Sequence, residues 1–81
     1  MKWYSTYQHP DGLNFIIELD ENVGYYTYLY ENAEYFKEDI GVEGCPHYQD
    51  NDLQDTLEIA KEVAQEQFGV PLDSWVETPL K

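Results

Sequence analysis

The chain has 81 residues, and its 17 Asp and Glu oppose 4 Lys with no Arg, which gives a formal net charge of −13. A chain of this length allows one domain, and an aromatic share of 16% argues against a disordered acidic tail. The charge argues against direct binding of nucleic acid or of a membrane, and without a long apolar run the expected location is the cytoplasm.

The first half of the chain predicts an antiparallel meander. Three segments are rich in aromatic and β-branched residues, which fit a pleated sheet, and Gly, Pro, Asn and Asp between them favour tight turns. The predicted strands lie at residues 2–8, 13–19 and 25–30. The second strand alternates, and its aliphatic face consists of Leu13, Phe15, Ile17 and Leu19.

Residues 35–40 are predicted as a fourth strand that follows a turn at 31–34. The alternative is a short amphipathic helix, because Ala33, Phe36 and Ile40 recur at spacings of four and three residues. The choice decides whether the meander has three or four strands.

The clearest local pattern is a helix at residues 53–68. Asp52 is the expected N-cap, and Gly69 and Pro71 are expected to end the helix. Its apolar stripe consists of Leu53, Leu57, Ala60, Ala64 and Phe68. The sequence therefore predicts an α+β fold, an antiparallel three- to four-stranded meander with one C-terminal helix packed on one face. Residues 80–81 are expected to fray.

The predicted helix also carries an acidic ridge on its other face. The ridge consists of Asp55, Glu58, Glu62 and Glu66. Like charges three or four residues apart cost a few tenths of a kcal/mol per pair, so a helix selected for stability alone would alternate Glu with Lys. The ridge is interpreted either as a surface for a basic partner or as an ordinary solvated face.

The third strand divides its side chains by parity. Leu29, with Tyr25 and Thr27, is expected to face the helix beside the aliphatic face of the second strand. The open face is expected to carry Tyr26, Tyr28 and Tyr30, with Glu31 and Glu34 in the turn beyond. Three exposed tyrosines are typical of a protein-binding surface. The alternatives are that these tyrosines form the core, or that they pack only on each other across strands.

Signals for a metal, a cofactor or catalysis are weak. Cys45 is the single cysteine, so an intramolecular disulfide is excluded. Cys45 and His47 together supply too few ligands for a zinc site. The segment DNDLQD at 50–55 lacks the Gly and the final acid of a calcium loop. Without a phosphate-binding loop or a nucleophile motif, we expect no metal, no cofactor and no enzymatic activity.

The segment LQDTLEIAKEVAQEQFGVPLDSW at 53–75 resembles the C-terminal part of short uncharacterised bacterial proteins with a small antiparallel sheet and one helix. The resemblance covers this third of the chain, implies the architecture and transfers no functional residues. In size, acidity and aromatic content the chain is also loosely similar to small acidic immunity proteins and phage-encoded inhibitors.

The sequence therefore predicts a small acidic inhibitor that occupies a basic surface of a target protein. The target would be a nucleic-acid-binding enzyme or a toxin, so the inhibitor would be of a phage anti-defence, DNA-mimic or toxin-immunity type. The expected contact residues are Tyr26, Tyr28, Tyr30, Glu31, Glu34, Asp55, Glu58, Glu62 and Glu66. The alternative is a non-inhibitory structural or regulatory subunit, or a homodimer formed through the tyrosine face.

Overall fold

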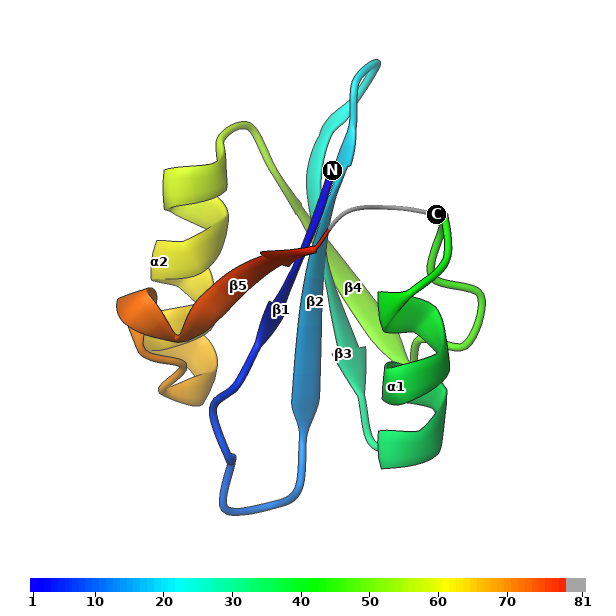
Figure 1. Cartoon of the computed structure of the whole chain (residues 1–81). Helices are drawn as coiled ribbons and strands as arrows, with labels where there is room; N and C mark the ends of the chain where they lie inside the picture. Colours follow the sequence, from blue (N-terminus) through cyan, green and yellow to red (C-terminus); the bar gives the residue numbers. More distant parts are fainter. Residues whose placement is uncertain (79–81) are drawn as a thin grey trace.

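The computed structural model of the protein describes residues 1–78, so the expectation for residues 80–81 lies outside it. The described chain forms a five-stranded antiparallel sheet with one α-helix against each face (Figure 1). In chain order the elements are β1 (Lys2–Ser5), β2 (Asn14–Asp20), β3 (Gly24–Tyr30), α1 (Ala33–Ile40), β4 (Asp50–Gln54), α2 (Leu57–Phe68), the 3-10 turn η1 (Leu72–Ser74) and β5 (Trp75–Thr78).

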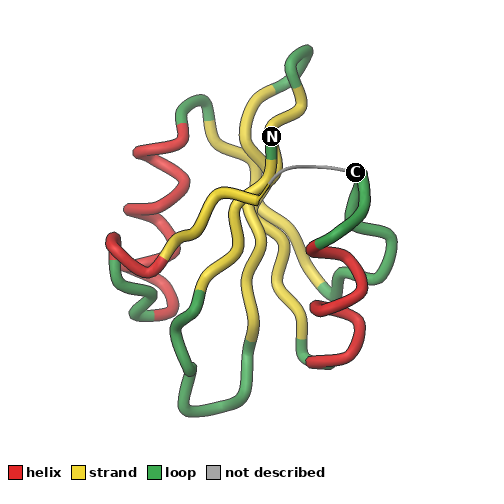
Figure 2. The backbone as a smooth tube through the Cα atoms, viewed as in Figure 1, coloured by secondary structure: helices red, strands yellow, loops and turns green. Residues whose placement is uncertain are grey.

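The strand order β4-β3-β2-β1-β5 places β2 at the centre of the sheet (Figure 2). Within the hairpin of β2 and β3, Phe15 pairs with Leu29 and Ile17 pairs with Thr27. The predicted parity of the third strand is therefore correct for Thr27 and Leu29. Phe15, Ile16 and Ile17 are all 0% exposed. Because successive side chains point to opposite faces, three consecutive buried residues require cover on both faces.

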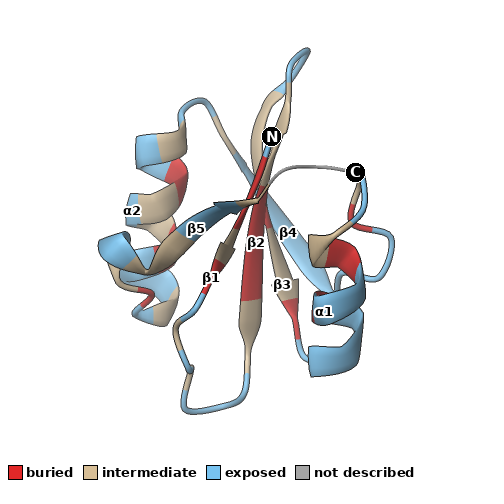
Figure 3. Ribbon diagram, viewed as in Figure 1, coloured by how far each residue is buried: buried red, intermediate tan, exposed pale blue. Residues whose placement is uncertain are grey.

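The helix α2 covers the face that carries Phe15 and Ile17. Its small residues Ala60 and Ala64 pack directly against this face. The larger neighbours in these two clusters include Trp3, Phe68, Val70 and Trp75. Burial is concentrated in β1 and β2, and the outer sides of both helices are exposed (Figure 3).

The helix α1 covers the opposite face, which the sequence analysis expected to be open. Ile16, Tyr30, Phe36 and Cys45 form its buried cluster. Phe36 and Ile40 come from α1 at the helical spacing of four residues. The sheet is therefore the middle layer of three, with separate apolar cores on its two sides.

The prediction of a strand at 35–40 is wrong, and the helical alternative is correct. The Oδ1 atom of Asn32 accepts hydrogen bonds from the backbone N–H groups of Glu34 at 2.9 Å and Tyr35 at 3.2 Å. This N-cap satisfies two of the free donors at the helix start. The segment that reads as a turn is thus the beginning of α1.

The C-terminal helix is shorter than predicted, because the chain forms β4 before the helix begins. Asp52 lies in β4 and pairs with Thr27, so it is not the N-cap. Thr56 takes that role and accepts a hydrogen bond from the Ile59 N–H at 3.1 Å. Gly69 ends the helix in the left-handed conformation, as predicted, with φ of 74°. Within residues 1–78 the fold has five strands, where three or four were expected, and two α-helices, where one was expected.

Candidate functional site

The expectation that three tyrosines of β3 lie on an open sheet face is wrong for Tyr30. This side chain is 1% exposed and lies under α1, where its hydroxyl donates a hydrogen bond to Asp39 Oδ2 at 2.6 Å. Burial, followed by this hydrogen bond, raises the pKa of Tyr30, so the hydroxyl remains a donor. Tyr30 is therefore a core residue, whereas Tyr26 and Tyr28 remain partly exposed.

Tyr26 and Tyr28 line an open hollow beside α1, with a volume of about 650 Å³. Its other walls come from β2, from the turn that follows β2 and from the loop after α1. We call it the tyrosine hollow and define it by Glu18, Asp20, Glu21, Tyr26, Tyr28 and Glu43. Four of these six side chains are carboxylates, so the hollow combines aromatic surface with negative charge.

The aromatic part of the hollow extends into the loop before β4. The ring centroids of Tyr26 and Tyr28 are 5.8 Å apart, and those of Tyr28 and Tyr48 are 4.9 Å apart. Burial, followed by the nearby Cys45 thiol and Glu18, raises the pKa of Tyr28 to about 12. Tyr28 is therefore neutral at physiological pH. Aromatic faces beside carboxylates attract cations, by cation–π interaction and by charge-assisted hydrogen bonds.

A buried lysine lies next to Glu18, one of the residues that line the hollow. Lys2 is 0% exposed, and its ammonium group donates hydrogen bonds to the carbonyls of Asp39, of Val42 at 2.7 Å and of Gly44 at 2.6 Å. These carbonyls lie at the end of α1 and just beyond it, where the helix dipole favours a cation. Glu18 Oε1 lies 3.9 Å from the ammonium nitrogen. Lys2 thus binds α1 and its following loop to β1.

The buried carboxylate of Asp39 contacts the same loop at His47. Asp39 Oδ2 accepts the N–H of His47 at 3.0 Å, and Asp39 Oδ1 lies 2.9 Å from His47 Nδ1. Burial alone would raise the pKa of Asp39, but the hydrogen bonds from Tyr30 and His47 outweigh burial, and the pKa is lowered. The His47 ring stacks on Tyr35 at 4.8 Å. These contacts fix the loop that carries Glu43.

Cys45 is a packing residue of this cluster. Its side chain is buried, and its thiol donates to Glu18 Oε1 at 3.5 Å. Burial raises the pKa of Cys45 to about 12, so the reactive thiolate is suppressed at neutral pH. Within residues 1–78, no group of three or more His, Cys, Asp or Glu side chains has an arrangement that could hold a metal ion.

The remaining predicted contact residues are exposed, but they do not form one surface with the hollow. Glu58, Glu62 and Glu66 lie on the exposed side of α2, which packs on the opposite face of the sheet from α1 (Figure 1). Asp55 precedes the N-cap and is not part of the helix. Glu31 precedes α1, and Glu34 lies in its first turn. The predicted residues therefore do not lie on one continuous surface.

The four carboxylates of the hollow and the burial of Lys2 were not predicted from the sequence. A signal for part of the hollow was present, because a hairpin of β2 and β3 with a short turn places Glu18 opposite Tyr26. No local signal marked the burial of Lys2, since its hydrogen-bond partners are 37 to 42 residues away along the chain.

No protein-family model, no curated protein and no solved structure matches the chain. Within residues 1–78, no helix combines the length and the apolar character needed to cross a membrane. A functional assignment therefore depends on the geometry and charge of the surface.

Proposed function

We propose that the protein binds a basic surface of another protein and thereby blocks that surface. The observation that carries the proposal is the burial of Lys2, which removes one of the few cations from an already acidic surface. Lys37 and Lys61 are the other lysines within residues 1–78. Of the 17 acidic residues, all of which lie in this range, Asp39 alone is buried. Because one lysine and one acid are buried, the surface keeps the net charge of the composition, while its ratio of acidic to basic side chains is higher.

The tyrosine hollow supports this proposal because it offers more than charge. Tyr26 and Tyr28 provide rigid amphipathic surface of the kind enriched in protein interfaces. The adjacent carboxylates of Asp20, Glu21 and Glu43 would attract Lys and Arg side chains of a partner. The basic partner would be a toxin or an enzyme that binds nucleic acid, since such proteins present positive surfaces.

The alternative of a homodimer through the tyrosine face is less well supported. That alternative needs an open sheet face, and α1 occupies part of this face and buries Tyr30. Two copies would also bring the carboxylates of two hollows together, which costs free energy through like-charge repulsion.

The proposal is tested by capture and kinetics with the native chain. Tagged protein is used to capture partners from the lysate of its own host, and association with the captured partner is measured across a range of salt concentrations. We expect the association rate to fall steeply as salt rises, because electrostatic steering is screened. An association rate that does not change with salt would contradict the proposal, as would a salt-insensitive homodimer in light scattering.

Charge-reversal variants locate the contact. One triple variant changes Asp20, Glu21 and Glu43 to Lys in the hollow, and the matched triple variant changes Glu58, Glu62 and Glu66 to Lys on α2. Both variants change the net charge equally, so an effect of net charge alone predicts equal losses of affinity. We expect the two losses to differ, because the contacts of a partner are not spread equally over the two faces of the sheet.

A further inference from the structure

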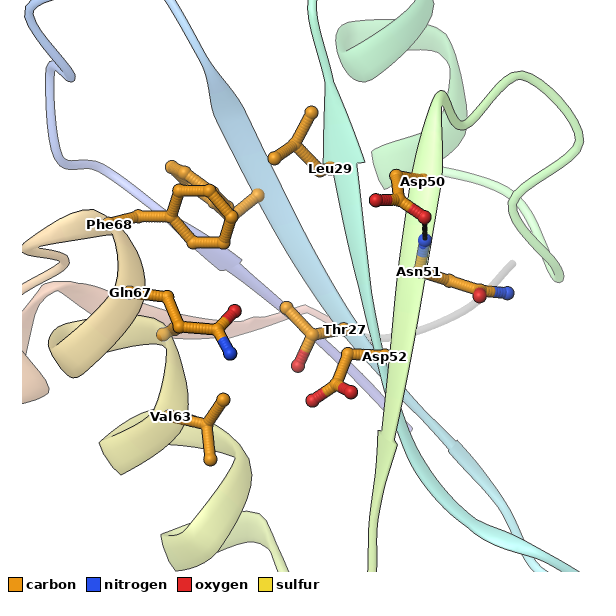
Figure 4. A pocket seen from close by; sticks show the side chains of 10 residues that line it. Thr27, Leu29, Asp50, Asn51, Asp52, Val63, Gln67 and Phe68 are labelled. Atoms are coloured by element: carbon orange, nitrogen blue, oxygen red, sulfur yellow. Dashed lines mark hydrogen bonds between the residues drawn. The ribbon is translucent and has the colours of Figure 1, made fainter.

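A second concavity lies on the other face of the sheet, between α2 and β4 (Figure 4). We call it the α2–β4 groove. The helix packs through Ala60 and Ala64 over the centre of the sheet, and the inner face of β4 remains exposed. The groove has a volume of about 200 Å³. Pockets for drug-sized ligands have about 300–1,000 Å³, so this space matches a single side chain.

The groove has apolar walls and an acidic rim. Its walls include Phe15, Leu29, Val63 and Phe68. Its rim carries Asp50 and Asp52, which pair with Leu29 and Thr27 across the β3–β4 ladder and therefore project to the α2 side. An occupant would need an apolar stem and a cationic end.

The unpaired hydroxyl of Thr27 is a second, independent observation that favours a ligand in the groove. Its side chain is 9% exposed, and its Oγ1 is buried without a hydrogen-bond partner in the described structure. A valine would fill the same space without leaving a buried polar atom unpaired. In Figure 4 the polar ends of Thr27, Asp52 and Gln67 converge on the gap between α2 and β4. The Thr27 side chain thus lines the groove, and its hydroxyl, although covered in the free protein, has unused capacity for a hydrogen bond.

We propose that the α2–β4 groove binds the side chain of an arginine. This inference rests on the proposed function for the source of the arginine, which is the basic partner protein. The planar guanidinium has five donors in a fixed fork and stacks on aromatic faces. Here its acceptors are the carboxylate of Asp52, the amide oxygen of Gln67 and the Thr27 hydroxyl, and Phe68 provides the aromatic face.

Asp52 retains the acceptor capacity that this requires. Its Oδ2 accepts one hydrogen bond, from Gln54 Nε2 at 2.8 Å, and an ionised carboxylate offers about four acceptor positions. Inward-pointing acids also protect an edge strand such as β4 from pairing with other chains. That protective role explains Asp50 and Asp52, but it explains neither the concavity nor the unpaired hydroxyl of Thr27.

The test uses the free protein and small probes, observed by NMR of the ¹⁵N-labelled chain. We expect n-butylguanidinium to shift the amide signals of Thr27, Asp52 and Gln67 in a saturable manner. The neutral isostere n-butylurea should leave them unchanged. Saturation by n-butylammonium at equal affinity would overturn the assignment to arginine. Shifts that do not saturate, or that spread over all acidic residues, would overturn the site.

Two variants and one matched control refine the test. Asp52→Asn removes the charge-assisted acceptor, and we expect it to lower the affinity for n-butylguanidinium about tenfold. Thr27→Val should also lower the affinity for this probe, while the urea midpoint of the protein stays the same or rises. Asp20→Asn removes the same charge from the tyrosine hollow and should leave binding in the groove unchanged. If Asp20→Asn and Asp52→Asn lowered the affinity for the probe equally, net charge alone would explain the effect, and the site would be overturned.

Different results would refute the arginine site in the groove and the proposed function. A partner that binds the wild type and Asp52→Asn equally well would overturn the groove as the arginine site, and the proposed function would stand. Saturable binding of n-butylguanidinium in a protein with no salt-dependent partner would retain the site and refute the proposed function.

Discussion

The substitution Lys2→Met tests the buried ammonium group that connects β1 to the end of α1. Methionine keeps most of the apolar stem but removes the charge and its hydrogen bonds. The carbonyls of Asp39, Val42 and Gly44 then lose their donor, and Glu18 loses the cation 3.9 Å away. Because these groups stay in place, the substitution breaks a buried network rather than replacing it with an apolar one.

The magnitude follows from the burial of the network. Removing one partner of a buried charged group costs about 3–5 kcal/mol. The Val42 and Gly44 bonds are only partly buried, so water can replace some of the lost donors, and we expect a loss of about 3 kcal/mol. A chain of this size has a free energy of unfolding of about 4–12 kcal/mol. With a urea slope of about 1 kcal/mol per M, the midpoint should fall by about 3 M.

Lys37→Met is the matched control, because it removes the same charge from an exposed position in the last turn of α1. Its cost should stay below about 1 kcal/mol, the range of an exposed charge near a helix end. Urea unfolding followed by tryptophan fluorescence measures both variants. In addition, Lys2→Met should expose Cys45 to thiol reagents in native buffer. Equal midpoints for the two variants would refute the role assigned to Lys2.

The remaining predictions address other parts of the same structure. Tyr30→Phe should cost about 1.5–3 kcal/mol at pH 7 in urea unfolding. The folded-state pKa of Asp39 is lowered, so its contribution is present above the unfolded value of about 3.9 and is lost as pH falls through the folded pKa. The deficit of Tyr30→Phe should therefore shrink below about pH 4, and a deficit independent of pH would contradict the network. Cys45 should react slowly with a disulfide reagent at pH 8 and rapidly in urea, and fast reaction in native buffer would refute its burial. Gly24→Ala should lower the melting temperature, because φ is 147° and the new Cβ would lie 2.7 Å from the Gln54 carbonyl oxygen; an unchanged melting temperature would argue against this close approach of β3 and β4.

Local patterns were sufficient for the β2–β3 hairpin and for the end of α2. The alternation of β2 and the single aliphatic residue of β3 together predicted that Leu29 lies on the face of Phe15, and the register confirms it. Gly69 predicted the helix end because only glycine adopts a left-handed conformation without a steric penalty. Each of these features depends on residues that are close in the chain.

The candidate site was only partly predictable. Tyr26 and Tyr28 were identified from the parity of β3, and both line the tyrosine hollow. The same parity also placed Tyr30 on the open face, and this failed because α1 covers it. Strand parity predicts which side chains share a face, but it does not predict what covers that face.

The sequence by itself determined the strongly acidic surface, the antiparallel hairpin and the helix near the C-terminus. Only the tertiary structure decided that DNDLQ forms the edge strand β4, that α1 covers the second face, and that Lys2 is buried. The physical reason is that these features depend on distant partners. An edge strand of low β-propensity is held by the backbone of its neighbour, and a lysine is buried only where folding gathers three carbonyls around it.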